Sequence, residues 1–287
     1  MRHIALIVAL AVPAVAMAGF VSMEEGARAT GMGGAFVAVA NDASMVFWNP
    51  AGGTMLDGLE LTGMRTRLFG VSGLTEDCFA IGYGRWHGIG AGFGWSRSAI
   101  EDIYSENTFV GTIARSFLGG RLSLGTGLRI YRISAPGYAY YNDPAFKEND
   151  TGYAADLGLI YKAPRWSVAL VWRNIGEPEL SLVTTTEHPD PIYSEVRLGG
   201  TYIFREVMLI SGEIRRVREV PGFYDGKTSF HLGTEIWFFN AFALRAGVNR
   251  DRATAGLGLR IDRVTIDAAI VSERRPGNKY RLSLSLD

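Results

Sequence analysis

Apolar and polar residues alternate with a period of two in fourteen short segments between residues 58 and 287. This period is typical of β-strands that have one apolar and one polar face. In the segment 166–173, for example, Trp166, Val168, Leu170 and Trp172 share one face. Each segment has about the nine to eleven residues that a tilted strand needs to cross a membrane. We expect strands near 58–69, 76–85, 88–98, 105–117, 122–133, 152–162, 166–174, 193–203, 207–216, 228–238, 242–249, 253–261, 264–271 and 279–287.

The connections between these segments alternate between short and long. Short ones lie at 86–87, 118–121, 163–165, 204–206, 239–241 and 262–263, and longer ones at 134–150, 176–191, 217–227 and 272–278. A transmembrane β-barrel has this pattern because its periplasmic turns are short and its outer loops are longer. The sequence therefore predicts an all-β fold: a transmembrane antiparallel up-and-down β-barrel of about 14 strands.

Folding each hairpin about its short turn predicts which residues lie opposite each other. On the polar face, which should line the lumen, four pairs of opposite charge are expected: Asp156 with Arg173, Arg197 with Glu213, Glu235 with Arg245, and Arg260 near Asp267. The apolar face has Leu157 with Trp172, Val196 with Ile214, Ile236 with Leu244, and Leu259 with Ala268. Cross-strand charge pairs contribute about 0.2–1 kcal/mol each. Two interpretations stay open, a charged conduit and, preferred, a network that braces the inner wall and holds a plug.

Aromatic residues gather beside the short turns, where the interfacial girdle of a barrel belongs. They are Trp86, Phe117, Trp166, Phe204, Trp237, Phe238 and Phe239. Arg115 and Arg132 are charged residues at positions where the alternation predicts lipid-facing side chains. Both lie near strand ends, from which long side chains can reach the membrane surface.

The chain begins with features of an export signal. A short basic start, Met1-Arg2-His3, precedes an apolar run at 4–15 and the small-residue site Ala16-Met17-Ala18. This order predicts a cleaved signal peptide at 1–18 and export to the bacterial outer membrane. Residues 19–57 are rich in small side chains and lack the strand pattern. We expect them to form a partly helical hatch, or plug, in front of a barrel at 58–287.

Composition gives little support to other functions. The formal net charge is zero, so no nucleic-acid partner is expected, and the only cysteine, Cys78, excludes an internal disulfide. The four histidines, His3, His87, His188 and His231, show no metal-ligand spacing. Acidic loop residues such as Glu148 and Asp150 fit a solvated loop better than a cation site. We expect no enzyme, no cofactor and no metal.

The segment 26–52 reads GARATGMGGAFVAVANDASMVFWNPAG. It resembles the N-terminal signature of the FadL-type outer-membrane family, especially of its PorV/PorQ branch. Arg173-Asn174-Ile175-Gly176 resembles a strand-end motif of the same branch. The resemblance implies a fourteen-stranded barrel whose lumen holds a hatch. The hatch motif would then comprise Gly31, Gly33, Gly34, Asn49, Pro50 and Ala51.

Three functions follow as hypotheses. The first is a hatch-gated conduit for small hydrophobic, fatty-acid-like compounds, with a lateral exit between strands and outer tyrosines such as Tyr138, Tyr140 and Tyr141 as a landing site. The second, implied by the PorV branch, is a barrel that docks secreted proteins or partners a secretion apparatus. The third is a structural barrel without transport. In all three, outer-membrane lipid surrounds the protein.

Overall fold

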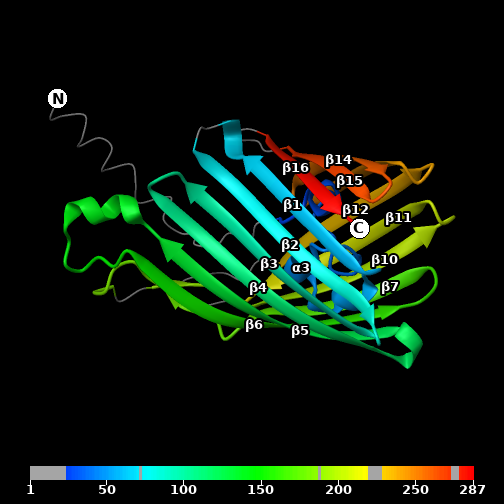
Figure 1. Cartoon of the computed structure of the whole chain (residues 1–287), viewed down its shortest axis with the longest axis horizontal. Coiled ribbons are helices and arrows are strands. Elements are labelled where there is room, and N and C mark those ends of the chain that lie inside the picture. The colour runs from blue at the N-terminus through cyan, green and yellow to red at the C-terminus, as the bar shows by residue number, and fades with distance from the viewer. Residues whose placement is uncertain (1–23, 71–72, 187–188, 219–227, 273–277) are drawn as a thin grey trace.

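A closed barrel of fourteen antiparallel strands forms most of the molecule (Figure 1). The computed structural model describes residues 24–70, 73–186, 189–218, 228–272 and 278–287. The predicted signal peptide, and with it His3, therefore lies outside the described residues, as does His188. The neighbours around the barrel are β1-β16-β15-β14-β13-β12-β11-β10-β7-β6-β5-β4-β3-β2, and the strand number and the up-and-down order confirm the sequence prediction.

The observed strand ends lie within a few residues of the predicted ones. The barrel strands are β1 (Leu59–Arg67), β2 (Leu74–Trp86), β3 (Ile89–Ile100), β4 (Tyr104–Phe117), β5 (Leu122–Ser134), β6 (Asn149–Lys162), β7 (Trp166–Ile175), β10 (Glu195–Phe204), β11 (Met208–Val217), β12 (Thr228–Phe238), β13 (Phe242–Asn249), β14 (Arg252–Ile261), β15 (Val264–Val271) and β16 (Lys279–Leu286). The long connection after β7 contains a small hairpin that the sequence analysis did not predict, formed by β8 (Glu179–Leu180) and β9 (Asp190–Pro191).

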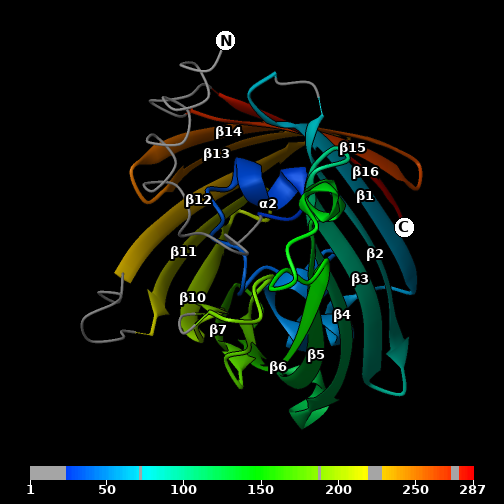
Figure 2. The same ribbon diagram turned by 90° about the vertical axis from the view of Figure 1, so that its left-hand side faces the viewer.

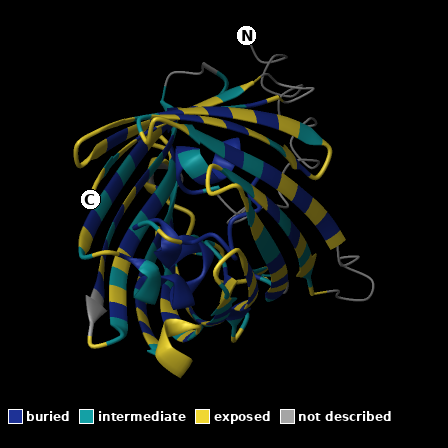
Figure 3. Cartoon of the chain, turned by 90° about the vertical axis from the view of Figure 1, so that its right-hand side faces the viewer, coloured by how far each residue is buried: buried dark blue, intermediate teal, exposed yellow. Residues whose placement is uncertain are grey.

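The outer face of the barrel is apolar and exposed, and its inner face is buried, which gives the alternating stripes of Figure 3. Along β7, Trp166, Val168, Leu170 and Trp172 are exposed, whereas the residues between them are buried. Large apolar side chains are exposed in this way on every barrel strand. An apolar surface of this extent is suited to lipid, so the barrel spans a membrane. Among the described residues, no helix has the length and hydropathy of a membrane span.

Two of the four predicted hairpin registers are confirmed by the apolar pairs. Leu157 lies opposite Trp172, and Ile236 lies opposite Leu244. The other two predictions are wrong by two residues, since Ile214 pairs with Leu198 and Ala268 pairs with Leu257.

The first error comes from the position of a turn. The turn after β10 was predicted at 204–206 but consists of the three residues between Phe204 and Met208, of which Arg205 and Glu206 have positive φ (48° and 61°). The turn after β14 consists of Asp262 and Arg263 as predicted, so the second error lies in the pairing, which was placed about a centre one residue too far along the chain. A shift of two residues leaves every side chain on its predicted face.

The predicted aromatic girdle also needs one correction. Phe117, Trp166, Phe204, Phe238 and Phe239 are exposed at the end of the barrel that carries the tight turns. Trp237, however, shares the inward parity of Glu235, and its ring lies 4.4 Å from the guanidinium carbon of Arg260 and 5.7 Å from that of Arg245. It is therefore part of the inner wall. The side chain of Trp86 is not described.

The N-terminal segment, residues 24–57, lies inside the barrel (Figure 2). It contains the helices α2 (Ala27–Gly31) and α3 (Met45–Trp48) and the 3-10 helix η1 (Pro50–Met55). Three further 3-10 helices, η2 (Leu68–Gly70), η3 (Leu118–Gly120) and η4 (Pro136–Tyr141), lie in strand connections. η1 begins with Pro50, and the Asn49 side chain caps it by accepting a hydrogen bond from the Ala51 N–H. Proline at the first position and asparagine at the cap both favour a helix start.

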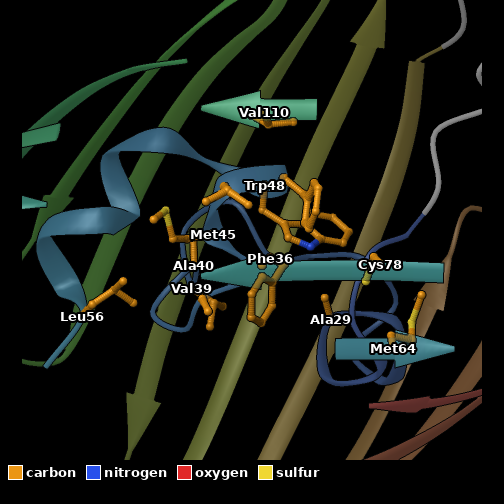
Figure 4. Packing of buried hydrophobic residues seen from close by; sticks show 14 of the residues in the cluster. Ala29, Phe36, Val39, Ala40, Met45, Trp48, Leu56, Met64, Cys78 and Val110 are labelled. Carbon is orange, nitrogen blue, oxygen red and sulfur yellow. The ribbon is translucent and has the colours of Figure 1, made fainter. Parts of the chain in front are cut away.

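The segment packs its own apolar residues against the wall of β1, β2 and β4 (Figure 4). Phe36, Met45 and Trp48 from the segment gather in one cluster with wall residues such as Cys78 and Val110. The ring centroids of Phe36 and Trp48 are 5.6 Å apart in an edge-to-face arrangement. The segment is therefore part of the molecule's hydrophobic core.

Candidate functional site

The inner wall meets the N-terminal segment at a belt of glycines. A Cβ atom added to Gly158 of β6 would lie 2.1 Å from Asn49 Oδ1, and one added to Gly125 of β5 would lie 2.5 Å from the backbone of Pro50 and Ala51. Side-chain Cβ atoms do not normally approach other atoms this closely, so only glycine fits at these positions. The Asn49-Pro50-Ala51 part of the predicted hatch motif is thus seated directly on the wall.

The glycines of the hatch motif contact the opposite wall in the same way. A Cβ added to Gly247 of β13 would lie 2.4 Å from the Gly33 nitrogen, and one added to Gly256 of β14 would lie 3.1 Å from Gly31 Cα. Gly33 and Gly34 also have positive φ (66° and 72°), which glycine adopts without strain. The sequence signal for this belt is glycine at inward positions of the strands, which the sequence analysis did not use.

From residue 32 to residue 40 the segment has neither helix nor strand, and wall side chains bind carbonyl groups of this stretch and of Gly31. Hydroxyls of Thr254, Ser211 and Ser167 donate to the carbonyls of residues 31, 35 and 38 at 3.1, 2.7 and 2.8 Å. His231 Nδ1 lies 2.9 Å from the carbonyl of residue 33. Buried backbone groups need such partners. The wall therefore replaces the hydrogen bonds that a helix or sheet would provide.

A first group of buried charges joins the segment to β12, β13 and β15. Arg28 forms a bidentate pair with Glu235, at 2.8 Å for both contacts, and a further pair with Asp42 at 2.8 Å. Glu235 also accepts from Arg245 at 2.6 Å, and Arg245 pairs with Asp267 at 2.6 Å. The predicted residues Glu235 and Arg245 lie opposite each other, and the segment's Arg28 completes their network.

A second group lies on β5, β6, β7, β10 and β11. Arg129 pairs with Asp156 at 2.5 Å and donates to the carbonyl of Phe47 at 3.1 Å, and Arg173 donates to the same carbonyl. Further pairs are Arg173–Glu195, Arg197–Glu195, Arg197–Glu213 and Arg215–Glu195. Glu213 also accepts from the N–H groups of Phe36 and Val37 at 3.1 and 3.2 Å. Both groups thus hold the segment as well as the wall.

Glu235 and Arg245 pair as predicted, whereas the other three predicted charge pairs differ from the prediction. Asp156 sits at a bulge, where the β6–β7 register shifts, and its ion-pair partner is Arg129. Arg197 and Glu213 form a 3.3 Å pair although they are not directly opposite. The placement of Arg260 near Asp267 is wrong, because Gly258 lies opposite Asp267. Arg260 is exposed at the tight-turn end and its Nε donates to Thr265 at 3.3 Å.

Asn174, in the predicted strand-end motif, ends β7 in a left-handed conformation with φ of 59°. It accepts from the Tyr131 hydroxyl at 2.5 Å and donates to the carbonyl of Tyr193 at 3.1 Å. These bonds tie the connection after β7 to the inner wall. Beside them lies an apolar cluster at the long-loop end, made of Tyr131, Ile133, Ala154, Leu180 and Ile192.

The remaining candidates do not form a catalytic or metal centre in the part of the chain that the structure describes. Cys78 is buried under the segment, and no group of three or more metal-ligating side chains occurs among the described residues. Asp150 pairs with Lys147 at 2.9 Å and accepts from the Ser181 N–H. Tyr138 is exposed, and the side chains of Tyr140 and Tyr141 are not described.

One buried acid in the segment leads to a pH prediction. Burial raises the pKa of Glu25, and the nearby Arg173 and Arg129 oppose this effect. A raised pKa means that the group stabilises the folded state fully below its unfolded pKa, and that this stability is lost as pH rises through the folded pKa. We expect the contribution of Glu25 to the hydrogen-exchange protection of the segment to be larger below its raised pKa than above it, and Glu25→Gln to remove this contribution. If hydrogen-exchange protection of the segment depended on pH in the same way in Glu25→Gln and in the wild type, this prediction would be contradicted.

A membrane-spanning β-barrel whose lumen is filled by its own N-terminal segment is the class that these features define. Solved structures share the fold. The CymD monoaromatic hydrocarbon channel is 15% identical with a TM-score of 0.62, over 91% of this chain and 96% of that one. The Pseudomonas putida toluene transporter TodX is 13% identical with a TM-score of 0.61, over 84% and 91%.

A family model described as "Uncharacterised protein family (UPF0164)" matches residues 14–182, and the chain belongs to this family. A search of curated proteins finds no match. The likeness to CymD and TodX confirms the FadL-like fold that the resemblance implied.

Proposed function

We propose that the protein is an outer-membrane conduit for small hydrophobic compounds, with the N-terminal segment as its hatch. The carrying observation is an apolar strip on the inner face of β5, β6 and β7. At the long-loop end it consists of the cluster around Tyr131 and Leu180. Toward the tight turns it continues as Ile160, Ala169 and Val171, which pack against Val37, Ala38 and Ala51 of the hatch.

The hatch blocks this strip near its middle. Asn49 occupies the groove at Gly158, where it donates to the carbonyls of Val37 and Leu159 at 2.9 and 3.4 Å. The Arg129–Asp156 pair lies between the two apolar clusters and holds the backbone of α3 through Phe47. Movement of Asn49-Pro50-Ala51 away from β5 and β6, with release of the Phe47 carbonyl from Arg129, would open a path between the two apolar regions past the Arg129–Asp156 pair.

The barrel wall gives no support for a wide lateral exit in this state. Neighbouring barrel strands are hydrogen-bonded throughout the described part of the barrel. The pairing is irregular between Tyr83 and Trp86 on β2 and between Ala155 and Leu157 on β6. The second irregularity lies beside the apolar strip, so we place any lateral release of substrate there.

The names of the solved relatives agree with this proposal, because CymD is described as a monoaromatic hydrocarbon channel and TodX as a toluene transporter. The proposed substrate class is therefore small and apolar, either aromatic or fatty-acid-like. Docking of secreted proteins, which the PorV/PorQ resemblance favours, and a purely structural barrel are the alternatives that the experiment separates.

The test is uptake into liposomes that contain the purified chain. We expect uptake of a labelled long-chain fatty acid or of labelled toluene above that of empty liposomes. Replacement of Asn49-Pro50-Ala51 by Gly-Gly-Gly should raise it several-fold, because the cap of η1 and the contact with β6 are lost. Heat-shifted gel mobility would verify that each barrel is folded. Folded barrels without uptake in either form would overturn the proposal and favour docking or a structural role.

A further inference from the structure

Arginines interrupt the apolar outer face at the long-loop end of β1 and β3. Arg65 and Arg67 alternate with the buried Thr66 on β1, and Arg97 follows the buried Ser96 on β3, so all three have outward parity. The Arg65 side chain is 78% exposed. In contrast, outward positions further along these strands toward the tight turns are apolar, such as Leu59 and Phe93.

These arginines form one cluster through strand pairing. Arg65 lies directly opposite Asp77 on β2, and Asp77 lies directly opposite Arg97. Directly opposed residues on one face of a sheet are about 4.5–5.5 Å apart at their Cβ atoms. Arg67 follows on the same face of β1. Three guanidinium groups thus lie on the same patch as one carboxylate, Asp77, which Arg65 contacts at the long distance of 3.5 Å.

Aromatic side chains border the cluster on the side of the barrel's middle. Phe79 is the next outward residue after Asp77 on β2 and is 42% exposed. Trp95 is the outward residue before Arg97 on β3 and lies directly opposite Phe79. Aromatic rings of membrane proteins lie at the headgroup level, and arginines extend from there toward the polar surface. The cluster therefore lies at the border between acyl chains and headgroups.

We propose that the arginine cluster (Arg65, Arg67 and Arg97) binds the phosphate of an anionic lipid headgroup in the leaflet on the long-loop side. The excess of positive charge matches a phosphate, and guanidinium groups bind phosphate oxygens in bidentate fashion. The adjoining Phe79 and Trp95 offer an apolar surface to the acyl chains of the same lipid. A lipid fits better than a soluble anion because the neighbouring outward surface is apolar. This inference does not depend on the proposed transport function.

The probe is phosphatidylglycerol, compared with phosphatidylcholine, titrated onto the purified full chain in detergent and followed by native mass spectrometry. We expect the wild type to retain phosphatidylglycerol preferentially. The triple variant Arg65→Gln/Arg67→Gln/Arg97→Gln should lose this preference by about tenfold in affinity. The matched control, Arg115→Gln/Arg205→Gln/Arg263→Gln, removes three exposed arginines at the tight-turn end and should keep it.

A second variant tests the same site in the opposite direction. Asp77→Asn removes the carboxylate that competes for Arg65 and Arg97, so it should bind phosphatidylglycerol more tightly than the wild type does. The proposal is overturned if the triple variant keeps the wild-type preference, if the control triple loses as much, or if Asp77→Asn weakens binding. Asp77→Asn also decides the question if the triple variant fails to fold.

Discussion

Gly158→Val is expected to convert the closed barrel into an open one. The Cβ atom alone would lie 2.1 Å from Asn49 Oδ1 and 2.9 Å from Pro50 Cδ, and valine adds two methyl groups. Asn49 is fully buried and holds both the Ala51 N–H and the Val37 carbonyl. The Asn49 side chain cannot move away from the added side chain without breaking these bonds. The hatch motif should therefore leave the wall of β5 and β6.

The measurement is ion conductance in planar bilayers together with protease cleavage within residues 24–57. We expect wild-type barrels to be mostly closed and Gly158→Val barrels to be conducting and cleaved. Gly111→Val is the matched control, because Gly111 is an exposed strand glycine and its added Cβ would meet nothing within 4 Å. If Gly158→Val barrels stayed closed and protected, the hatch would not be seated at this glycine in the membrane.

The fold could be predicted from the sequence because the lipid-facing side of a strand must be apolar where it crosses the hydrocarbon core of the membrane. A period of two can be recognised even where the ends of a strand are uncertain, so the number of strands could be predicted. Register was harder, because it depends on the turn. The turn was predicted at 204–206, one residue too early, because nothing in the sequence indicates that Phe204 still belongs to β10, and the predicted pairing of β10 with β11 was therefore shifted by two residues.

The site was predictable only in part, for a different reason. Charges such as Glu235 and Arg245 could be placed on the inner face from parity alone. Their third partner, Arg28, comes from a segment without period, which no hairpin geometry positions. Likewise, the close approach of Asn49 to Gly158 joins residues 109 positions apart. Such contacts depend on the three-dimensional path of the segment, which local patterns do not determine.

Glu235→Gln is expected to destabilise the protein strongly. The carboxylate accepts three hydrogen bonds, two from Arg28 and one from Arg245; Glu235 and Arg245 are buried, and Arg28 is mostly buried. Removing one partner of a buried ion pair costs about 3–5 kcal/mol, since the remaining charge stays buried without compensation. Asp42 and Asp267 each keep one arginine partly neutralised, which places the expected loss at the lower end of this range.

Urea unfolding followed by tryptophan fluorescence would measure the loss, with Lys147→Gln as the control. Lys147 forms a partly exposed pair with Asp150, for which a change of about 0–1 kcal/mol is expected. Hydrogen exchange of residues 24–57 then shows which part of the molecule the charge network stabilises. If Glu235→Gln lowers protection of the N-terminal segment and the barrel strands keep theirs, the network serves to hold the hatch. If both lose protection together, it braces the wall. An effect no larger than that of Lys147→Gln would contradict both, because a buried acid that binds two arginines cannot be neutral to stability.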